Sequence, residues 1–356
     1  MRGLNLKTIK KIDKSDMLSL LLDFPGQCKA ALDIGKRTEL LFDHNAFNKI
    51  VFCGLGGSAI GADLVRSYLY FESKIPIIVL REYNLPGYVD NSSLVFISSY
   101  SGNTEETLSS YLEAKNKNAF IITISSGGKL EEYAHADKIT FIPIPSGLPP
   151  RCALGYLSIV PLAILGKLGI IPKVDIDSSI RQMIEILDDL KDNSLKPTIA
   201  QSDNLAKSIA KKLYHKFSIV YSPSVHFDVC ATRLRGQLNE NSKALASSHV
   251  FPEMNHNEIV GWQNPRRLFK DFVVLMLRDS RAHPRVEKRM NITKDILNKE
   301  GIRVLEIYSH GEDLLSRIFS LIYIGDFISY YLAILYGIDP TPVERVTYLK
   351  NQLVKE

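Results

Sequence analysis

Residues 94–107 read Leu-Val-Phe-Ile-Ser-Ser-Tyr-Ser-Gly-Asn-Thr-Glu-Glu-Thr, and this stretch decides the fold. Its four apolar residues predict a short buried strand, and Thr104 followed by two acidic residues predicts the capped start of a helix. A helix N-terminus offers unpaired backbone N–H groups and a positive dipole end, and hydroxyls such as those of Ser99 and Ser101 add neutral donors. The turn therefore predicts an anion-binding loop, in which Gly102 permits a positive φ or a close backbone approach. Taken alone, it is equally consistent with an ordinary capped helix.

A second turn of this kind lies upstream. Residues 50–53 predict a short strand, and residues 54–61 read Gly-Leu-Gly-Gly-Ser-Ala-Ile-Gly before a helix over 62–70. The glycine spacing also fits the dinucleotide fingerprint, with Glu82 in the place of the ribose-binding acid. We favour a compact anion such as a phosphate monoester, because Ser58 puts a hydroxyl where a pyrophosphate needs bare backbone. Ligands of open parallel sheets bind beyond the carboxyl ends of the strands, so the two turns can converge on one anion.

Short runs rich in valine and isoleucine alternate with helical segments along the chain, which is typical of parallel sheets covered on both faces. Further strands are predicted at 76–80, 119–124, 139–142, 217–221, 272–277 and 303–307. Residues 175–213 are predicted to be helical throughout. We therefore expect an α/β fold with two three-layer α/β/α sandwich domains and mainly parallel sheets, linked by helices. The expected division is an N-terminal domain at 1–150, a helical crossover at 151–213 and a C-terminal domain at 214–356.

The composition indicates a soluble globular protein, with 45% apolar and 23% charged residues in a chain of 356. The net charge of +5 is scattered, with no basic run interleaved with aromatics, so it favours small anionic substrates over nucleic acid. The four cysteines form no C-x-x-C pair, which argues against a zinc site and suits a reducing cytoplasm. Residues 314–338 are apolar but contain Arg317 and Asp326, so a buried core helix is expected rather than a membrane span. No signal peptide is expected, because Asp13 and Asp16 interrupt the N-terminal region.

Several motifs together resemble one family. They are the pair of turns at 54–61 and 99–107, Pro149-Pro150-Arg151, the Gln-Leu-Asn-Glu-Asn-Ser-Lys stretch at 237–243, the Pro-Glu-Met-Asn-His-Asn-Glu-Ile-Val-Gly-Trp stretch at 252–262, and Tyr348-Leu349-Lys350. The serine-rich turn resembles the sugar isomerase (SIS) domain in general. The whole set resembles the bifunctional phosphoglucose/phosphomannose isomerase family, whose members have two SIS domains and form homodimers. The resemblance covers nearly the whole chain.

The resemblance implies an enzyme that interconverts glucose 6-phosphate, mannose 6-phosphate and fructose 6-phosphate without a cofactor. Its phosphate-binding residues would be Gly57 through its backbone, Ser58, Ser99, Ser101 and Thr104. Its catalytic residues would be Glu240, His256, Arg151 and Lys350. His256 would reach the active site of the other subunit, so a homodimer would be required for activity.

The reaction needs groups of these types. Moving the C2 proton to C1 on one face of an enediolate needs a base, for which Glu240 is the candidate. Developing negative charge on the enediolate oxygens needs a fixed cation, for which Arg151 is the candidate. Ring opening needs proton transfer near neutral pH, which suits the imidazole of His256. Lys350 would assist ring opening.

Other functions compete with this interpretation. A non-catalytic sugar-phosphate sensor could use the same domains, but it would have no use for Glu240, Arg151 and His256. An amidotransferase would need a glutaminase domain with an N-terminal cysteine, whereas this chain starts Met-Arg-Gly. A dinucleotide enzyme ranks last. Many phosphomannose isomerases are zinc enzymes, but no cluster with ligand spacing is present here, so we expect a metal-independent reaction that EDTA leaves intact.

Overall fold

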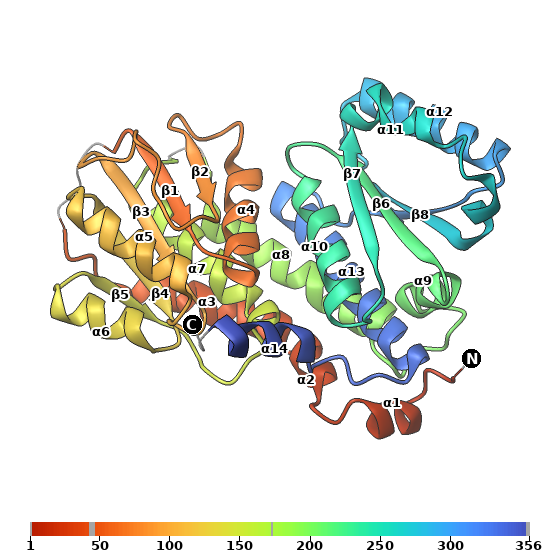
Figure 1. Cartoon of the computed structure of the whole chain (residues 1–356), viewed down its shortest axis with the longest axis horizontal. Helices are drawn as coiled ribbons and strands as arrows, with labels where there is room; N and C mark the ends of the chain where they lie inside the picture. The colour runs from red at the N-terminus through yellow and green to blue at the C-terminus, as the bar shows by residue number, and fades with distance from the viewer. Residues whose placement is uncertain (1, 43–46, 172–173, 354–356) are drawn as a thin grey trace. The chain divides into compact units, whose positions relative to one another are not determined.

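The structure is a computed structural model that describes residues 2–42, 47–171 and 174–353. It contains two compact parallel-sheet α/β units (Figure 1). We call Asp23–Ile186 with Gly311–Ser316 the N-terminal unit, and Met1–Leu22 with Leu187–His310 and Arg317–Glu356 the C-terminal unit. The expected α/β fold with two mainly parallel sheets is confirmed.

The N-terminal unit is built on a five-stranded sheet of order β2-β1-β3-β4-β5, in which every neighbouring pair is parallel. Its strands are β1 (Lys49–Cys53), β2 (Ile77–Leu80), β3 (Ser93–Ser98), β4 (Phe120–Ser125) and β5 (Thr140–Pro143). All six residues of β3 are buried, as the apolar run predicts for a central strand. The helical elements are α3 (Phe24–Arg37), α4 (Gly57–Leu69), α5 (Glu105–Asn116), α6 (Lys129–Ala136), the 3-10 helix η1 (Pro150–Cys152) and α7 (Leu154–Lys167).

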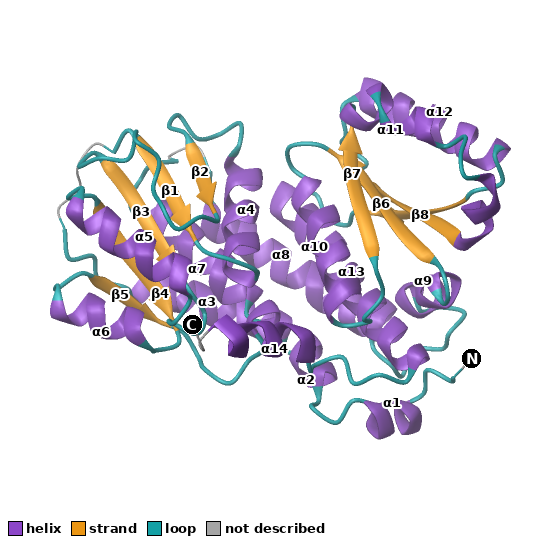
Figure 2. Cartoon of the chain, viewed as in Figure 1, coloured by secondary structure: helices purple, strands orange, loops and turns teal. Residues whose placement is uncertain are grey.

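Alternate residues of each strand face opposite helix layers, as the pleat requires. Val51, Val95 and Ile121 share one apolar cluster with Tyr111 of α5 and Leu130 of α6. On the other side α7 packs against both α3 and α4, so the sheet has a helix layer on each face (Figure 2). This is the three-layer sandwich expected from the sequence.

The C-terminal unit has a four-stranded parallel sheet of order β7-β6-β8-β9. Its strands are β6 (Phe217–Pro223), β7 (Ala246–Phe251), β8 (Phe272–Arg278) and β9 (Arg303–Tyr308). Its helical elements are α1 (Leu6–Ile12), α2 (Met17–Leu22), the π-helix η2 (Lys191–Leu195), α9 (Leu205–Leu213), α10 (Asp228–Glu240), the 3-10 helices η3 (Glu253–His256) and η4 (Arg266–Asp271), α11 (Glu258–Gly261), α12 (Pro284–Lys299), α13 (Leu314–Tyr336) and α14 (Glu344–Leu353). α8 (Ile176–Leu190) runs from one unit into the other.

This partition differs from the expected division at residues 150 and 213. The first 22 residues pack with the C-terminal unit, because Tyr330 donates to Asp13 Oδ2 (2.9 Å) and Tyr323 donates to the Leu21 carbonyl (2.7 Å). Arg2 donates to the Tyr336 carbonyl (2.6 Å), where a cation also suits the negative end of the α13 dipole. α7, expected in the crossover, packs with the N-terminal unit against α3.

Two further expectations differ from the structure. Residues 196–204 interrupt the helix expected over 175–213, between η2 and α9. β7 was not among the predicted strands, because Ser247, Ser248 and His249 are polar and half-buried at the edge of the sheet.

α13 is long and apolar enough to cross a membrane, but its most apolar 18-residue window is entirely buried inside the protein. It is the core helix of the C-terminal unit, as its charged residues predict. Asp326 forms a buried ion pair with Arg233 of α10, with a distance of 2.7 Å between Nη2 and Oδ2. Gln237 of α10 donates to the same carboxylate at 2.9 Å. These bonds fix α10, and therefore its last residue Glu240, against α13.

Candidate active site

The two predicted turns lie side by side at the carboxyl ends of β1 and β3. The strands pair in register, with Cys53 opposite Ile97. A Cβ placed on Gly54 would lie 2.8 Å from the Ser98 carbonyl oxygen and 3.0 Å from the Ser58 Cβ. The two turns are therefore in direct contact, and a side chain larger than hydrogen at Gly54 would separate them.

The first turn brings Arg151 next to the start of α4. Gly56 has φ 54°, and α4 begins at Gly57 with Ser58 buried in its first turn. A Cβ on Gly57 would lie 2.6 Å from the Pro150 carbonyl oxygen, so the peptide that leads into Arg151 packs directly on the helix N-terminus. The Arg151 side chain is itself 5% exposed. The backbone at Arg151, the N-terminus of α4 and Ser58 thus belong to one small region.

The second turn presents its hydroxyls at the N-terminus of α5. The Oγ of Ser99 and the Oγ1 of Thr104 are 2.9 Å apart and share a hydrogen bond. Thr104 is the N-cap residue, yet its side chain makes no capping bond to the α5 backbone. Ser101 is exposed, and its Oγ accepts from the Asn103 backbone N–H at 3.3 Å. The turn is therefore shaped by its own side chains and leaves the N-terminus of α5 without a side-chain cap from Thr104.

A third turn, which the sequence reasoning missed, supports the second. It follows β4 over residues 125–130 (Ser-Ser-Gly-Gly-Lys-Leu). The Leu130 N–H donates to the Gly102 carbonyl (3.0 Å) and the Lys129 N–H donates to Asn103 Oδ1 (3.1 Å). A Cβ on Gly102, whose φ is 69°, would lie 1.7 Å from the Gly127 carbonyl oxygen. The Gly-Gly pair after a strand was the signal available in the sequence.

Replacing Gly102 by alanine is therefore expected to raise the KM for a phosphate-ester substrate, the ligand that the two turns predict, at least about tenfold, because both the positive φ and the contact with Gly127 oppose a Cβ. Gly87→Ala is the matched control, since a Cβ there meets nothing within 4 Å. Steady-state kinetics of both purified variants check this. A Gly102→Ala enzyme with a KM within twofold of wild type would contradict the structural reading of this turn.

The chain on each side of Arg151 is held by two residues to which the sequence analysis gave no role, Gln27 and Tyr100. Gln27 of α3 donates to the Cys152 carbonyl (2.8 Å) and accepts from the Gly155 N–H (2.7 Å), so one buried amide spans the joint between η1 and α7. Tyr100 accepts from the Leu148 N–H (2.7 Å) through its hydroxyl, which also donates to the Pro145 carbonyl (3.0 Å). Burial raises the pKa of Tyr100, so this hydroxyl stays protonated at neutral pH.

Glu240 is the last residue of α10 and lines a pocket of about 640 Å³. The pocket lies within the C-terminal unit, between the end of α10 and the segment that leads into α14. Its other lining residues are Asn239, Lys243, Ala244, Leu245, Ile338, Asp339, Pro342, Val343, Glu344, Arg345 and Val346. Glu240 therefore lies at a solvent-accessible cavity rather than on a flat helix surface.

The other polar residues of the 237–243 motif hold the end of α10, which carries Glu240, in place. Asn241 donates to Ser329 Oγ (3.0 Å) and Ser242 donates to the Ser329 carbonyl (2.6 Å), which fixes the end of α10 on α13. Lys243 donates to the carbonyls of Glu240 (2.7 Å) and Pro340 (2.8 Å). One ammonium group thus joins the helix end that carries Glu240 to the 339–342 segment.

The structure does not bring His256 near Glu240 within one chain. Glu240 precedes β7 and its neighbour Asn239 accepts from the Ala246 N–H at the start of that strand, whereas His256 follows the end of β7. A strand of six residues spans about 20 Å, so the two side chains lie at opposite ends of β7. His256 is exposed in η3, and Lys350 is exposed in α14.

The predicted residues thus fall into two groups. Gly57, Ser58, Ser99, Thr104 and Arg151 gather in the N-terminal unit, with Ser101 at the outer side of the same turn, and Glu240, His256 and Lys350 belong to the C-terminal unit. Among the described residues, no group of three or more His, Cys, Asp or Glu side chains is arranged to hold a metal ion. Metal independence stays a prediction.

The two parallel-sheet α/β units form an SIS-type fold. Solved structures share this fold. A hypothetical protein from Thermus thermophilus superposes with a TM-score of 0.76 at 14% identity, covering 98% of this chain and 92% of its own. Glucosamine-6-phosphate deaminase from Thermotoga maritima superposes with a TM-score of 0.64 at 19% identity, covering 90% and 96%.

Sequence relatives narrow the class to one family. A "bifunctional phosphoglucose/phosphomannose isomerase" from Caldicellulosiruptor bescii is 47% identical over 339 residues, which is 95% of this chain and 99% of the relative. One from Aquifex aeolicus is 38% identical and covers 89% of this chain and 94% of the relative. The family model "Bacterial phospho-glucose isomerase C-terminal SIS domain" matches residues 202–353. The chain belongs to the bifunctional phosphoglucose/phosphomannose isomerase family, and it is an isomerase.

Proposed function

We propose that this enzyme interconverts glucose 6-phosphate and mannose 6-phosphate with fructose 6-phosphate through a cis-enediolate. The observation that carries the proposal is the contact between the two hydroxyl-rich turns at the ends of β1 and β3, with the Arg151 segment packed on the first of them. Such a region suits a dianionic phosphate ester, because it combines helix N-termini with hydroxyl donors. The names of the relatives support the two aldose substrates.

The phosphate is assigned to Ser58, Ser99, Ser101 and Thr104 and to the backbone of Gly57. Neutral hydroxyl and amide donors hold the ester without a full counter-charge, so the product can leave readily. Arg151 is assigned to the enediolate oxygens. Its burial supports this role, because a cation in a poorly solvated region stabilises developing negative charge more strongly than one in water.

Glu240 is assigned as the base. Its carboxylate takes the proton from C2 of the open-chain aldose, which leaves the enediolate, and returns it to C1. The hydroxyl proton of O2 passes to O1 in the same exchange, which leaves the C2 carbonyl of the ketose. The 640 Å³ pocket that Glu240 lines supports this role, since a sugar needs access to the carboxylate. Mannose 6-phosphate and glucose 6-phosphate differ in configuration at C2 and give the same planar enediolate, so one base serves both.

His256 is assigned to ring opening in the partner subunit of a homodimer, and Lys350 assists it. The separation of His256 from Glu240 by the length of β7 supports a partner's histidine at each site. We place the enzyme in the cytoplasm, where hexose 6-phosphates are made and consumed. The reaction needs no cofactor.

A coupled assay tests the proposed function. Fructose 6-phosphate formation should be observed from glucose 6-phosphate and from mannose 6-phosphate, at rates that preincubation with EDTA leaves within twofold. Turnover of neither aldose phosphate, with binding of both, would instead favour a sensor. Activity that is lost with EDTA and restored by zinc would contradict the metal-independent mechanism.

A further inference from the structure

Segment 254–262 carries His256, and His256 is the one polar side chain of this segment that the proposed reaction uses. His256 is exposed, while Met254 is fully buried and Trp262 is 6% exposed. Glu258 is half-buried. The proposed chemistry gives Glu258 and Trp262 no role, yet both point into the protein, and their contacts there explain how the segment is held.

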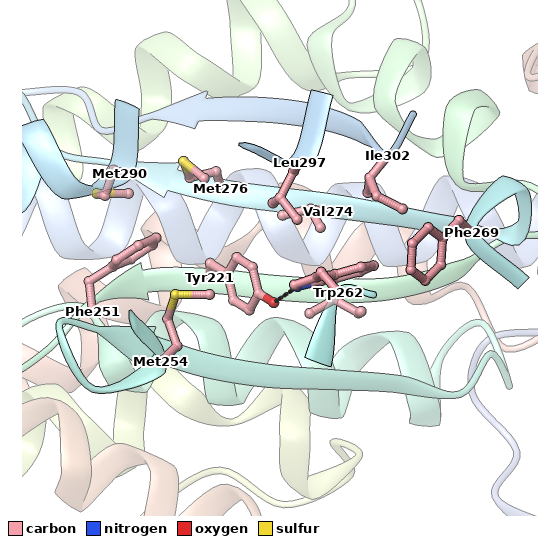
Figure 3. Packing of buried hydrophobic residues seen from close by; sticks show 11 residues of the cluster. Tyr221, Phe251, Met254, Trp262, Phe269, Val274, Met276, Met290, Leu297 and Ile302 are labelled. Atoms are coloured by element: carbon pink, nitrogen blue, oxygen red, sulfur yellow. Dashed lines mark hydrogen bonds between the residues drawn. The ribbon is translucent and has the colours of Figure 1, made fainter. Parts of the chain in front are cut away.

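The anchor is the hydroxyl of Tyr221 on β6. Tyr221 donates to Glu258 Oε1 at 2.5 Å and accepts from Trp262 Nε1 at 2.9 Å, the bond drawn as a dashed line in Figure 3. Tyr221 is fully buried, and β6 is an inner strand of the sheet, paired with β7 on one side and β8 on the other. One rigid hydroxyl therefore binds two residues of the segment that are four positions apart.

The direction of these two bonds is fixed. Burial and the neighbouring Glu258 carboxylate raise the pKa of Tyr221, so the hydroxyl keeps its proton. Its single proton goes to Glu258, because the Trp262 indole is a donor only. The Tyr221 hydroxyl can therefore satisfy both partners at once, and phenylalanine could satisfy neither.

The remaining contacts hold the same segment on the apolar cluster of the C-terminal unit. Trp262 makes edge contacts with Phe269 (5.7 Å between ring centroids) and Phe272 (5.8 Å), and Met254 lies against the same cluster (Figure 3). On the other side of His256, Asn255 donates to Thr293 Oγ1 of α12 at 2.9 Å. His256 and Asn257 are thus the exposed residues between two attachment points, Asn255 and Glu258.

We propose that Tyr221 is a positioning residue for His256: its hydroxyl, bonded to Glu258 and Trp262, holds the 254–262 segment so that the imidazole keeps the orientation that ring opening needs. This inference rests on the role of His256 under the proposed function. Tyr221 itself does not touch the substrate in this proposal. Tyr221 affects catalysis only by fixing the backbone of the 254–262 segment, and with it the position of His256.

The test is a double-mutant cycle on kcat/KM with glucose 6-phosphate, using Tyr221→Phe and His256→Ala. We expect Tyr221→Phe to lower kcat/KM by about 10- to 100-fold in the wild-type background, as a misplaced catalytic group does. In the His256→Ala background the same change should lower it less than twofold, because there is no imidazole left to position. A loss of folded enzyme would lower the rate by the same factor in both backgrounds.

Three further variants distinguish the effect of the Tyr221 hydrogen bonds from the effect of core packing. Glu258→Gln keeps an acceptor oxygen for Tyr221 and should stay within about threefold of wild type, whereas Glu258→Leu should match Tyr221→Phe. Met276→Leu is the packing control, since Met276 lies in the same cluster on β8 and is not part of the segment. It should leave kcat/KM within twofold of wild type.

The outcomes are distinguishable. If His256→Ala has wild-type activity, the role of His256 in the proposed function is wrong, and this inference falls with it. If His256→Ala is impaired but Tyr221→Phe is not, or Tyr221→Phe acts equally in both backgrounds, the proposed function stands and only the positioning role is wrong.

Discussion

Glu240→Gln is expected to lower kcat for both aldose phosphates by about 10³-fold, since a positioned general base typically contributes 10²- to 10⁴-fold. The amide has nearly the shape of the carboxylate but cannot take the C2 proton. Binding should persist, because the phosphate is assigned to turns in which Glu240 has no part. The measurements are kcat from the coupled assay and the Kd of a non-reactive sugar phosphate by calorimetry.

Glu287→Gln is the matched control, because Glu287 is an exposed glutamate on α12 of the same unit and lies outside the pocket. Its kcat should stay within twofold of wild type. A Glu240→Gln enzyme with more than a tenth of wild-type turnover would remove Glu240 as the base. Loss of inhibitor binding together with turnover would show that Glu240 acts in binding instead.

The Glu240→Gln variant also tests whether each active site contains residues from both subunits of the proposed homodimer. Glu240→Gln and His256→Ala chains can be co-expressed with different tags and purified as mixed dimers. If a site takes Glu240 from one chain and His256 from the other, each mixed dimer has one complete site and about half of wild-type activity. If both residues act within one chain, the mixed dimer stays as inactive as the parent variants. Failure to recover any mixed dimer would contradict the homodimer.

The second large effect concerns stability. Asp326→Ala is expected to lower the free energy of unfolding by about 3–5 kcal/mol, because it removes the Asp326 carboxylate from its ion pair with the buried Arg233 guanidinium. Both side chains are 4% exposed, so water cannot replace the lost partner. Gln237 loses an acceptor as well. Urea titrations followed by circular dichroism measure the change.

The double variant Arg233→Leu/Asp326→Leu is the control. Replacing a buried ion pair by apolar residues is often neutral, so the double variant should be more stable than Asp326→Ala alone. An Asp326→Ala protein within 1 kcal/mol of wild type would mean that the Arg233–Asp326 pair does not fix α10 on α13.

The sequence alone determined the elements that depend on interactions between residues close together in the chain. The apolar run of β3, the two acidic residues that open α5 and the glycines of the first turn specify strand, helix and turn within a few residues, so the parallel α/β fold and the hydroxyl-rich turns were predictable. The side-chain cap expected from Thr104 does not form. Arg317 and Asp326 within α13 similarly excluded a membrane span in favour of a core helix. Glu240 and His256 were found through motifs around them, and their roles stay predictions.

Only the tertiary structure decided which residues hold these groups in place. Gln27 bonds to Cys152, 125 positions away, and Tyr221 bonds to Glu258, 37 positions away. In the sequence Gln27 is an ordinary helix residue and Tyr221 an ordinary strand residue. The attachment of residues 1–22 to α13 and the polar edge strand β7 were equally hidden. Such contacts depend on where distant segments meet, and a local pattern of hydrophobicity or capping carries no information about that.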